Sequence, residues 1–144
     1  MAKKQEKNYA LPFLRIALGV VFLYAGLSKV INPDWSAAGF LANANTFPAF
    51  YGWLGSQFNI EWVNFLNQWG LTLVGAGLVL GAVTRYAAYG GMLMMVLYYF
   101  PSLDFPMAGE HAFLVDEHIV YIAALAVLVK YQAGQVWGLD KSLS

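Results

Sequence analysis

The side chains best suited to proton chemistry lie near the start of the last apolar segment: Asp116, Glu117, His118 and Tyr121. Residues three or four apart share a helix face, so a helix here would place Tyr121 beside both Glu117 and His118. A histidine titrates near neutral pH and can pass protons, and a neighbouring carboxylate can exchange them with it. Glu117 and His118 are therefore the candidate catalytic residues.

Further polar side chains are expected at the same level of the molecule. Asn64, Asn67 and Gln68 are three or four residues apart and would share one helix face. Lys29 lies near the end of the first apolar segment, where its charge would attract an anion. The candidate binding residues of this outer polar layer are Lys29, Asn67, Gln68, Asp116 and Tyr121, and Tyr98 and Tyr99 complete the layer.

Two interpretations of the outer polar layer stand side by side. Polar side chains between packed helices can form a hydrogen-bonded plug that does no more than hold the helices together. Alternatively, the layer is a site that serves an anion, protons and a lipid-soluble acceptor. Ionisable groups inside a membrane are costly, which is the argument for the second interpretation.

Arg15 is a separate candidate, because it lies about 9 Å into the first apolar segment at 1.5 Å per residue. Its side chain is long enough to reach the nearby headgroups. It could equally face the interior and bind an anion or a quinone carbonyl there. We include Arg15 among the candidate binding residues.

Metal chemistry receives little support from the sequence. Five possible ligands lie within nine residues, but their spacing matches no known metal motif; they are Glu110, His111, Asp116, Glu117 and His118. The absence of cysteine excludes thiolate zinc sites, iron–sulfur clusters and disulfides. We expect no metal and no covalently bound cofactor.

The amino-acid composition indicates whether the folded chain is surrounded by water or by lipid. Apolar residues make up 60% of the 144 residues and charged residues 11%. A chain of this size cannot bury so much apolar surface in water, so the composition favours the lipid bilayer. The net charge is zero with only eight Lys and Arg, which argues against nucleic-acid binding.

Four apolar segments approach the length of about 20 residues that a membrane-spanning helix needs. They cover residues 9–31, 63–84, 86–100 and 115–133. The first is too long for the apolar core of a cleaved signal peptide, so we expect it to remain as a span. The predicted fold is all-α: a single transmembrane domain over residues 1–144, forming an integral membrane four-helix bundle.

The long loop over residues 32–62 is rich in aromatic residues and carries only two charges. Loops of this length without structure of their own are uncommon, and Trp and Tyr favour the headgroup level of a membrane. We therefore predict short interfacial or re-entrant helices across the outer mouth of the bundle. They would act as an interfacial anchor or as a substrate lid.

The orientation follows from the distribution of Lys and Arg, which favour the cytoplasmic side. With four spans, both termini share one side, and seven of the eight basic residues fall on it: Lys3, Lys4, Lys7, Arg15, Arg85, Lys130 and Lys141. Only Lys29 falls on the other side. We therefore predict cytoplasmic termini and place the polar layer of Glu117 and His118 at the outer side.

Several segments resemble the DoxX family. They are RIALGVVFLYAGLSKVINP (15–33), NQWGLTLVGAGLVLGAVTR (67–85), DEHIVY (116–121) and GLD (138–140). More closely, the chain is similar to the membrane subunit of thiosulfate:quinone oxidoreductase. The resemblance implies a multi-pass protein of the plasma membrane of a bacterium or archaeon. The namesake activity oxidises thiosulfate to tetrathionate and passes electrons to quinone. Many relatives carry Glu early in the second span, where this chain has Gln68.

Two principal hypotheses follow. In the first, the chain is a quinone-linked oxidoreductase component, and a quinone and a small sulfur oxyanion bind the outer polar layer. In the second, it is a non-catalytic scaffold or accessory subunit that packs against a partner membrane subunit or a second copy of itself. A small transporter ranks behind both, because the spans show no convincing inverted repeat.

Overall fold

The computed structural model describes residues 8–144. Within that range, β-structure is limited to two isolated bridges, which pair Met107 with Asp104 and with Phe113. The predicted all-α fold is confirmed. Lys3, Lys4 and Lys7, which contribute to the charge comparison, lie outside the described residues. The long helices are α1 (Ala10–Val30), α4 (Ile60–Leu80), α5 (Thr84–Ser102) and α6 (Glu117–Lys130). The short elements are α2 (Ala38–Ala42), α3 (Pro48–Leu54), α7 (Asp140–Leu143) and the 3-10 helix Ala133–Gln135.

The predicted segments are helical, but their ends differ from the prediction for local reasons. The second begins at Ile60 and ends at Leu80, because Gly81 adopts a left-handed conformation with φ +66° and closes the helix. The fourth begins two residues later than expected, because Asp116 lies outside the helix as its N-cap, and it ends three residues earlier than expected, at Lys130. By length and composition, α1 and α4 qualify as candidate membrane spans.

The third segment does not stop at Phe100, since Pro101 lies within the last turn of α5. A proline has no backbone N–H, so the carbonyl four residues earlier loses its helical partner. That carbonyl belongs to Leu97, and the Tyr51 hydroxyl of α3 donates a hydrogen bond to it at 2.8 Å. The helix therefore tolerates the proline because a neighbouring element supplies the missing donor.

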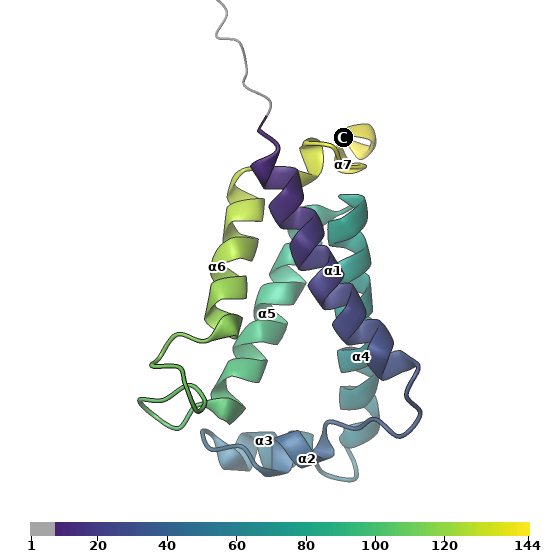
Figure 1. Cartoon of the computed structure of the whole chain (residues 1–144). Helices are drawn as coiled ribbons and strands as arrows, with labels where there is room; N and C mark the ends of the chain where they lie inside the picture. Colours follow the sequence, from purple (N-terminus) through teal and green to yellow (C-terminus); the bar gives the residue numbers. More distant parts are fainter. Residues whose placement is uncertain (1–7) are drawn as a thin grey trace, which may run out of the picture.

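The long helices pack mainly as two pairs, α1 with α4 and α5 with α6 (Figure 1). Glycines bring α1 and α4 into close contact, as expected for helices that associate in a membrane. A Cβ atom on Gly26 would overlap the backbone of Thr72, and one on Gly75 would overlap the backbone of Leu23. Any larger residue at either position would force the two helices apart.

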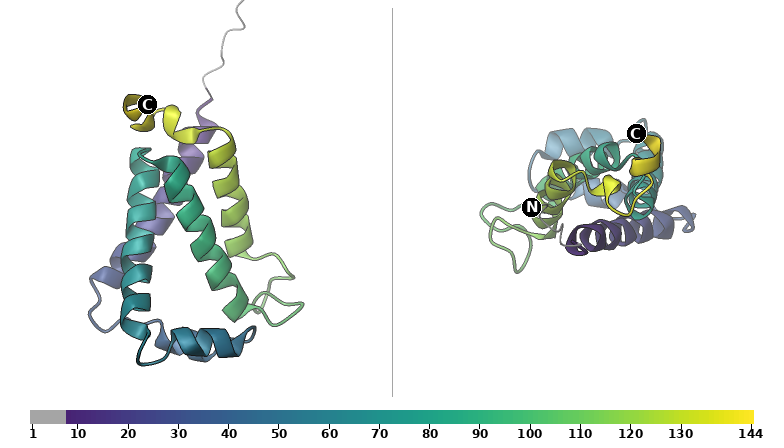
Figure 2. Two further views of the ribbon diagram at one scale, coloured as in Figure 1. Left: turned by 180° about the vertical axis from the view of Figure 1, so that it is seen from behind. Right: turned by 90° about the horizontal axis from the view of Figure 1, so that it is seen from above.

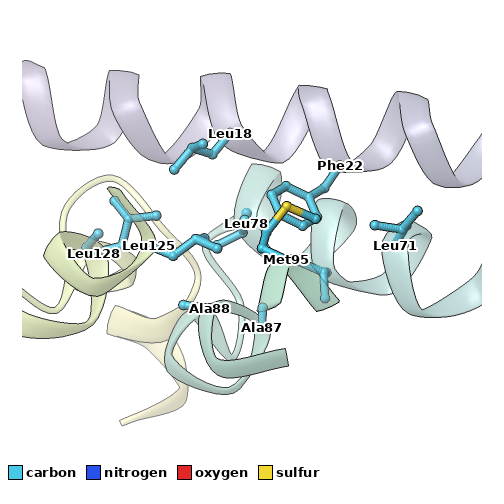
Figure 3. Packing of buried hydrophobic residues seen from close by; sticks show 11 residues of the cluster. Leu18, Phe22, Leu71, Leu78, Ala87, Ala88, Met95, Leu125 and Leu128 are labelled. Carbon is cyan, nitrogen blue, oxygen red and sulfur yellow. The ribbon is translucent and has the colours of Figure 1, made fainter. Parts of the chain in front are cut away.

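All four long helices contribute to one apolar core (Figure 3). Phe22 of α1 and Leu78 of α4 are almost completely buried there. Met95 of α5 and Leu125 of α6 close the core from the other pair. The core therefore fixes the relative positions of the helices that carry the predicted site residues.

The loop over residues 32–59 forms a cap across one end of the long helices, and α2 and α3 lie within it (Figures 1 and 2). Short helices were predicted here, and the structure contains them. Tyr51 of α3 is buried on the inner side of the cap, and burial raises the pKa of its phenol. Thr46 Oγ1 donates to the Leu103 carbonyl at 2.7 Å, so the cap is attached to the end of α5. We call this the cap end of the molecule.

The opposite end, the C-terminal end, holds the segment 131–144 (Figure 1). Backbone N–H groups of Leu139 and Asp140 donate to the carbonyls of Leu80 and Gly81, at 3.1 and 2.8 Å. The Asp140 carboxylate accepts the backbone N–H of Thr84 at 3.0 Å. The C-terminal segment therefore ties the end of α4 to the start of α5.

Candidate functional site

Asp116 and His118 form a close pair at the cap end, where α6 begins. Asp116 Oδ1 accepts the backbone N–H groups of His118 at 2.9 Å and Ile119 at 3.3 Å, so it caps the helix. Its other oxygen, Oδ2, lies 2.6 Å from His118 Nδ1. The side chains of His118 and Asp116 are 19% and 10% exposed. The carboxylate thus favours a proton on Nδ1 and leaves Nε2 free to accept or deliver one.

Tyr98 and Asn67 extend this pair across the neighbouring helices. The Tyr98 ring meets the His118 ring edge to face, with centroids 6.2 Å apart. The Tyr98 hydroxyl donates to Asn67 Oδ1, and Asn67 Nδ2 donates to the Val63 carbonyl at 2.8 Å. Three helices, α4, α5 and α6, therefore meet at one polar cluster: Asn67, Tyr98, Asp116 and His118. From the sequence, Tyr98 was assigned to the polar layer only by its position near the end of its apolar segment. Spacing within one helix cannot show contact with another helix.

Lys29 of α1 and Gln68 of α4 lie where these two helices meet, apart from the polar cluster. Gln68 Nε2 donates to the Lys29 carbonyl at 3.4 Å. Lys29 Nζ donates to the Ala25 carbonyl at 3.1 Å and lies 5.3 Å from the centre of the Trp35 ring. Among residues 8–144, no hydrogen bond joins either side chain to His118. The predicted layer is therefore divided into two groups.

Glu117 and Tyr121 do not join the cluster. Glu117 is exposed on the first turn of α6, and neither a hydrogen bond nor an ion pair holds its side chain within the described part of the chain. Tyr121 packs at the edge of the core, with its ring centroid 6.3 Å from that of Phe22. The spacing placed both on one helix face but did not show that the core begins one turn after Glu117, at Tyr121.

Arg15 faces the protein interior and is 0% exposed, so its side chain does not extend to the surface. Its Nη1 donates to the carbonyls of Leu78 at 2.6 Å and Val79 at 3.1 Å, at the end of α4. Its Nη2 donates to the Trp137 carbonyl at 2.9 Å, in the C-terminal segment. A cation is favourable at a helix C-terminus, and here it also joins that terminus to the C-terminal segment.

No group of three His, Asp or Glu side chains with metal-binding geometry occurs within residues 8–144. Glu110 and His111 lie on a loop, 4.0 Å apart, and both side chains are almost fully exposed. A metal site built from the five predicted ligands would need these two side chains beside the Asp116–His118 pair, and they do not lie together with it.

Comparison with known proteins gives one match. No curated protein and no solved structure matches the chain. The model of the DoxX family matches residues 10–109, which covers α1 to α5 and ends before α6. Because the match covers more than half of the sequence, the chain belongs to the DoxX family.

Proposed function

We propose that the protein is a multi-pass membrane protein in which α1, α4, α5 and α6 all cross the plasma membrane, with cytoplasmic termini. Outward-facing apolar side chains on each of these helices support this arrangement, because such a surface is unfavourable in water. Examples are Phe13, Val20, Leu73, Leu93 and Val120. The uneven distribution of Lys and Arg supports the orientation.

Within that membrane frame, the polar cluster at the cap end is the site of a quinone-linked oxidation of thiosulfate. Two thiosulfate ions join through a new sulfur–sulfur bond to give tetrathionate, and they release two electrons. The quinone takes these two electrons and two protons and becomes the quinol. The chain contains no cysteine, so the sulfur–sulfur bond forms without a protein thiol.

The Asp116–His118 pair carries this proposal, because quinone reduction needs a proton donor close to the cap-side membrane surface. With the proton of Nδ1 directed at Asp116, 2.6 Å away, His118 Nε2 can deliver a proton and then take another from water. His118 is an imidazolium before it delivers the proton and neutral until water reprotonates it, and the Asp116 carboxylate orients the ring in both states. Lys29, in the last turn of α1 at the cap end, supplies the positive charge that attracts the sulfur oxyanion.

The test is thiosulfate-dependent reduction of a short-chain ubiquinone by the purified full-length protein in detergent, with tetrathionate measured in parallel. The proposal predicts one tetrathionate for each quinol formed. It would be abandoned if the protein neither reduced the quinone nor retained any quinone after mild extraction from native membranes.

A second candidate function is that of a non-catalytic scaffold or accessory subunit. The observation in its favour is that Asp116 also caps α6, so the cluster has a structural role without any chemistry. Native purification distinguishes the two functions. A partner membrane subunit or a stable homo-oligomer, together with unchanged complex activity in His118→Gln, would favour the scaffold.

A further inference from the structure

A hollow at the C-terminal end lies far from the proposed redox cluster along α5 and α6. We call it the terminal hollow; it has a volume of about 590 Å³ and opens between the start of α5, the end of α6 and the C-terminal segment. This volume falls within the range of small-molecule sites, about 300–1,000 Å³. Polar lining residues come from the start of α5 and from the C-terminal segment, and apolar ones come mainly from α6 and from Leu143 of α7.

The polar part begins at the first turn of α5, which lacks a side-chain N-cap because Val83 occupies the capping position. The N–H groups of a first turn have no acceptor within their own helix and attract negative groups. Asp140 takes one of them, that of Thr84. The next residue, Arg85, lines the hollow and is exposed.

Thr84 provides an independent sign that the hollow is built for a ligand. The residue lines the hollow but is only 2% exposed. Its hydroxyl oxygen is buried and has no hydrogen-bond partner among residues 8–144. A buried hydroxyl without a partner costs free energy. A ligand oxygen would remove that cost once Gly134 and Asp140, which lie beside the hydroxyl, shift to admit it.

The charged side chains that line the hollow are one cation, Arg85, and one carboxylate, Asp140. The Asp140 carboxylate is already engaged, by the Thr84 N–H and by electrostatic attraction to Arg15. Arg85 forms no ion pair with any residue in the range 8–144, and its guanidinium lies 5.8 Å from the centre of the Tyr89 ring. A guanidinium matches the geometry of phosphate oxygens with paired donors.

The apolar part of the lining extends this site toward the side of the helices. Leu128 and Val129 of α6 and Leu143 of α7 form it. Under the orientation proposed above, the terminal hollow lies at the level of the cytoplasmic headgroups, where phospholipids present phosphate directly above their acyl chains. Basic sites between helices on this side are suited to lipid headgroups.

We propose that the terminal hollow binds phosphate, either as a phospholipid headgroup or as the free ion, through Arg85, the Thr84 hydroxyl and the first turn of α5. The proposal does not depend on the redox function, since it uses no residue of the cap-end cluster. Each can fail while the other holds.

Native mass spectrometry of the full-length, delipidated protein in detergent tests the proposal with three probes. These are dilauroyl phosphatidylglycerol, dilauroylglycerol, which has the same chains without phosphate, and inorganic phosphate. We expect Arg85→Gln to weaken binding of the phosphate probe by about tenfold, as for the loss of one charged hydrogen bond. Thr84→Val should also weaken binding, yet leave the ligand-free protein as stable as before or more stable, because it removes an unpartnered buried hydroxyl.

Lys130→Gln is the matched control, because Lys130 is also an exposed cation beside a tyrosine ring but does not line the hollow. Binding of phosphatidylglycerol but not of inorganic phosphate, sensitive to Arg85 alone, assigns the site to a lipid. Equal, Arg85-dependent binding of inorganic phosphate assigns it to the free ion. The proposal is overturned if dilauroylglycerol binds as well as phosphatidylglycerol, if Arg85→Gln and Lys130→Gln have equal effects, or if no probe binds.

Discussion

Arg15 at the C-terminal end and His118 at the cap end are both ionisable residues on long helices, yet their surroundings differ. Arg15 is fully buried, and backbone carbonyls from α4 and the C-terminal segment occupy both terminal nitrogens of its guanidinium. His118 uses one ring nitrogen for Asp116 and keeps the other free of any partner within residues 8–144. Its side chain also retains some exposure.

The difference separates a structural charge from a chemical one. A buried cation whose terminal nitrogens both donate to main-chain carbonyls is held in place, and in Arg15 only Nε lacks an acceptor within residues 8–144. A histidine that is oriented by a carboxylate and has one open nitrogen is prepared to transfer a proton. Arg15 therefore contributes to the stability of the C-terminal end, the redox site proposed above lies at the cap end, and the terminal hollow is a separate feature of the C-terminal end.

The largest expected effect comes from Arg15→Met. The substitution leaves the carbonyls of Leu78 and Trp137 buried without their donor, so we expect a loss of about 3 kcal/mol of unfolding free energy. Equilibrium unfolding in mixed detergent micelles measures it. Arg85→Met, which removes an exposed guanidinium, is the control and should change the stability by less than about 0.5 kcal/mol. Similar losses in the two variants would contradict the structural role of Arg15.

The second prediction concerns the cap end and rests on the proposed redox function. His118→Gln should lower thiosulfate-dependent quinone reduction by about 100-fold, because the proton donor is lost. Glu117→Gln, one residue earlier but exposed, should lower it by less than about twofold. If Glu117→Gln proved as damaging as His118→Gln, the active carboxylate would be Glu117 and the comparison would have to be redrawn.

The third prediction compares a glycine-to-alanine substitution at the C-terminal end with one at the cap end. A Cβ atom on Gly134 would overlap the carboxylate of Asp140 and approach Thr84 Oγ1, so Gly134→Ala should cost about 2 kcal/mol. A Cβ atom added to Gly52 of α3 would have no heavy atom of residues 8–144 within 4 Å. Gly52→Ala should therefore be neutral or stabilising by up to about 1 kcal/mol. Thermal unfolding of the two variants decides. Equal behaviour would mean that the C-terminal segment is not tightly packed.

The smallest effects distinguish the two acidic side chains that bind helix N-termini. Asp140→Ala removes the acceptor at the start of α5 and should cost about 1 kcal/mol. Asp116→Asn should cost less than about 0.5 kcal/mol, because asparagine caps helices as well as aspartate does.

Asp116→Asn should nevertheless change which ring nitrogen of His118 carries the proton, since the carboxylate that holds it on Nδ1 is gone. ¹⁵N NMR of the histidine rings measures this, with the exposed His111 as internal reference. An unaltered His118 spectrum would show that Asp116 serves only as a cap.

Much of the secondary structure followed from the sequence, because an apolar run of suitable length predicts a helix without knowledge of its partners. The ends were harder to predict. α5 continues through Pro101 only because Tyr51, distant in the sequence, donates to the freed Leu97 carbonyl. α6 begins after Asp116 because that side chain turns back to cap it.

The candidate site was predicted in part. Asp116 and His118 are neighbours in the sequence, so their pairing needed only a local turn. The role of Tyr98 and its bond to Asn67 depend on how α4 and α5 pack, which no spacing within one helix reveals. Glu117 and Tyr121 were included because both lie on the helix face that His118 shares with Tyr121. Glu117 is nevertheless exposed because it is the first residue of α6 and lies beyond the core, whereas Tyr121, one turn later, packs against it.

The sequence by itself determined the helical class of the protein and the presence of polar residues near the ends of its helices, since both follow from composition and local order. Only the tertiary structure decided what each polar residue does. The fate of an ionisable side chain depends on the acceptors and donors around it, and these come from other helices. For Arg15 they are carbonyls that accept from both terminal nitrogens of its guanidinium, whereas for His118 they leave one ring nitrogen open.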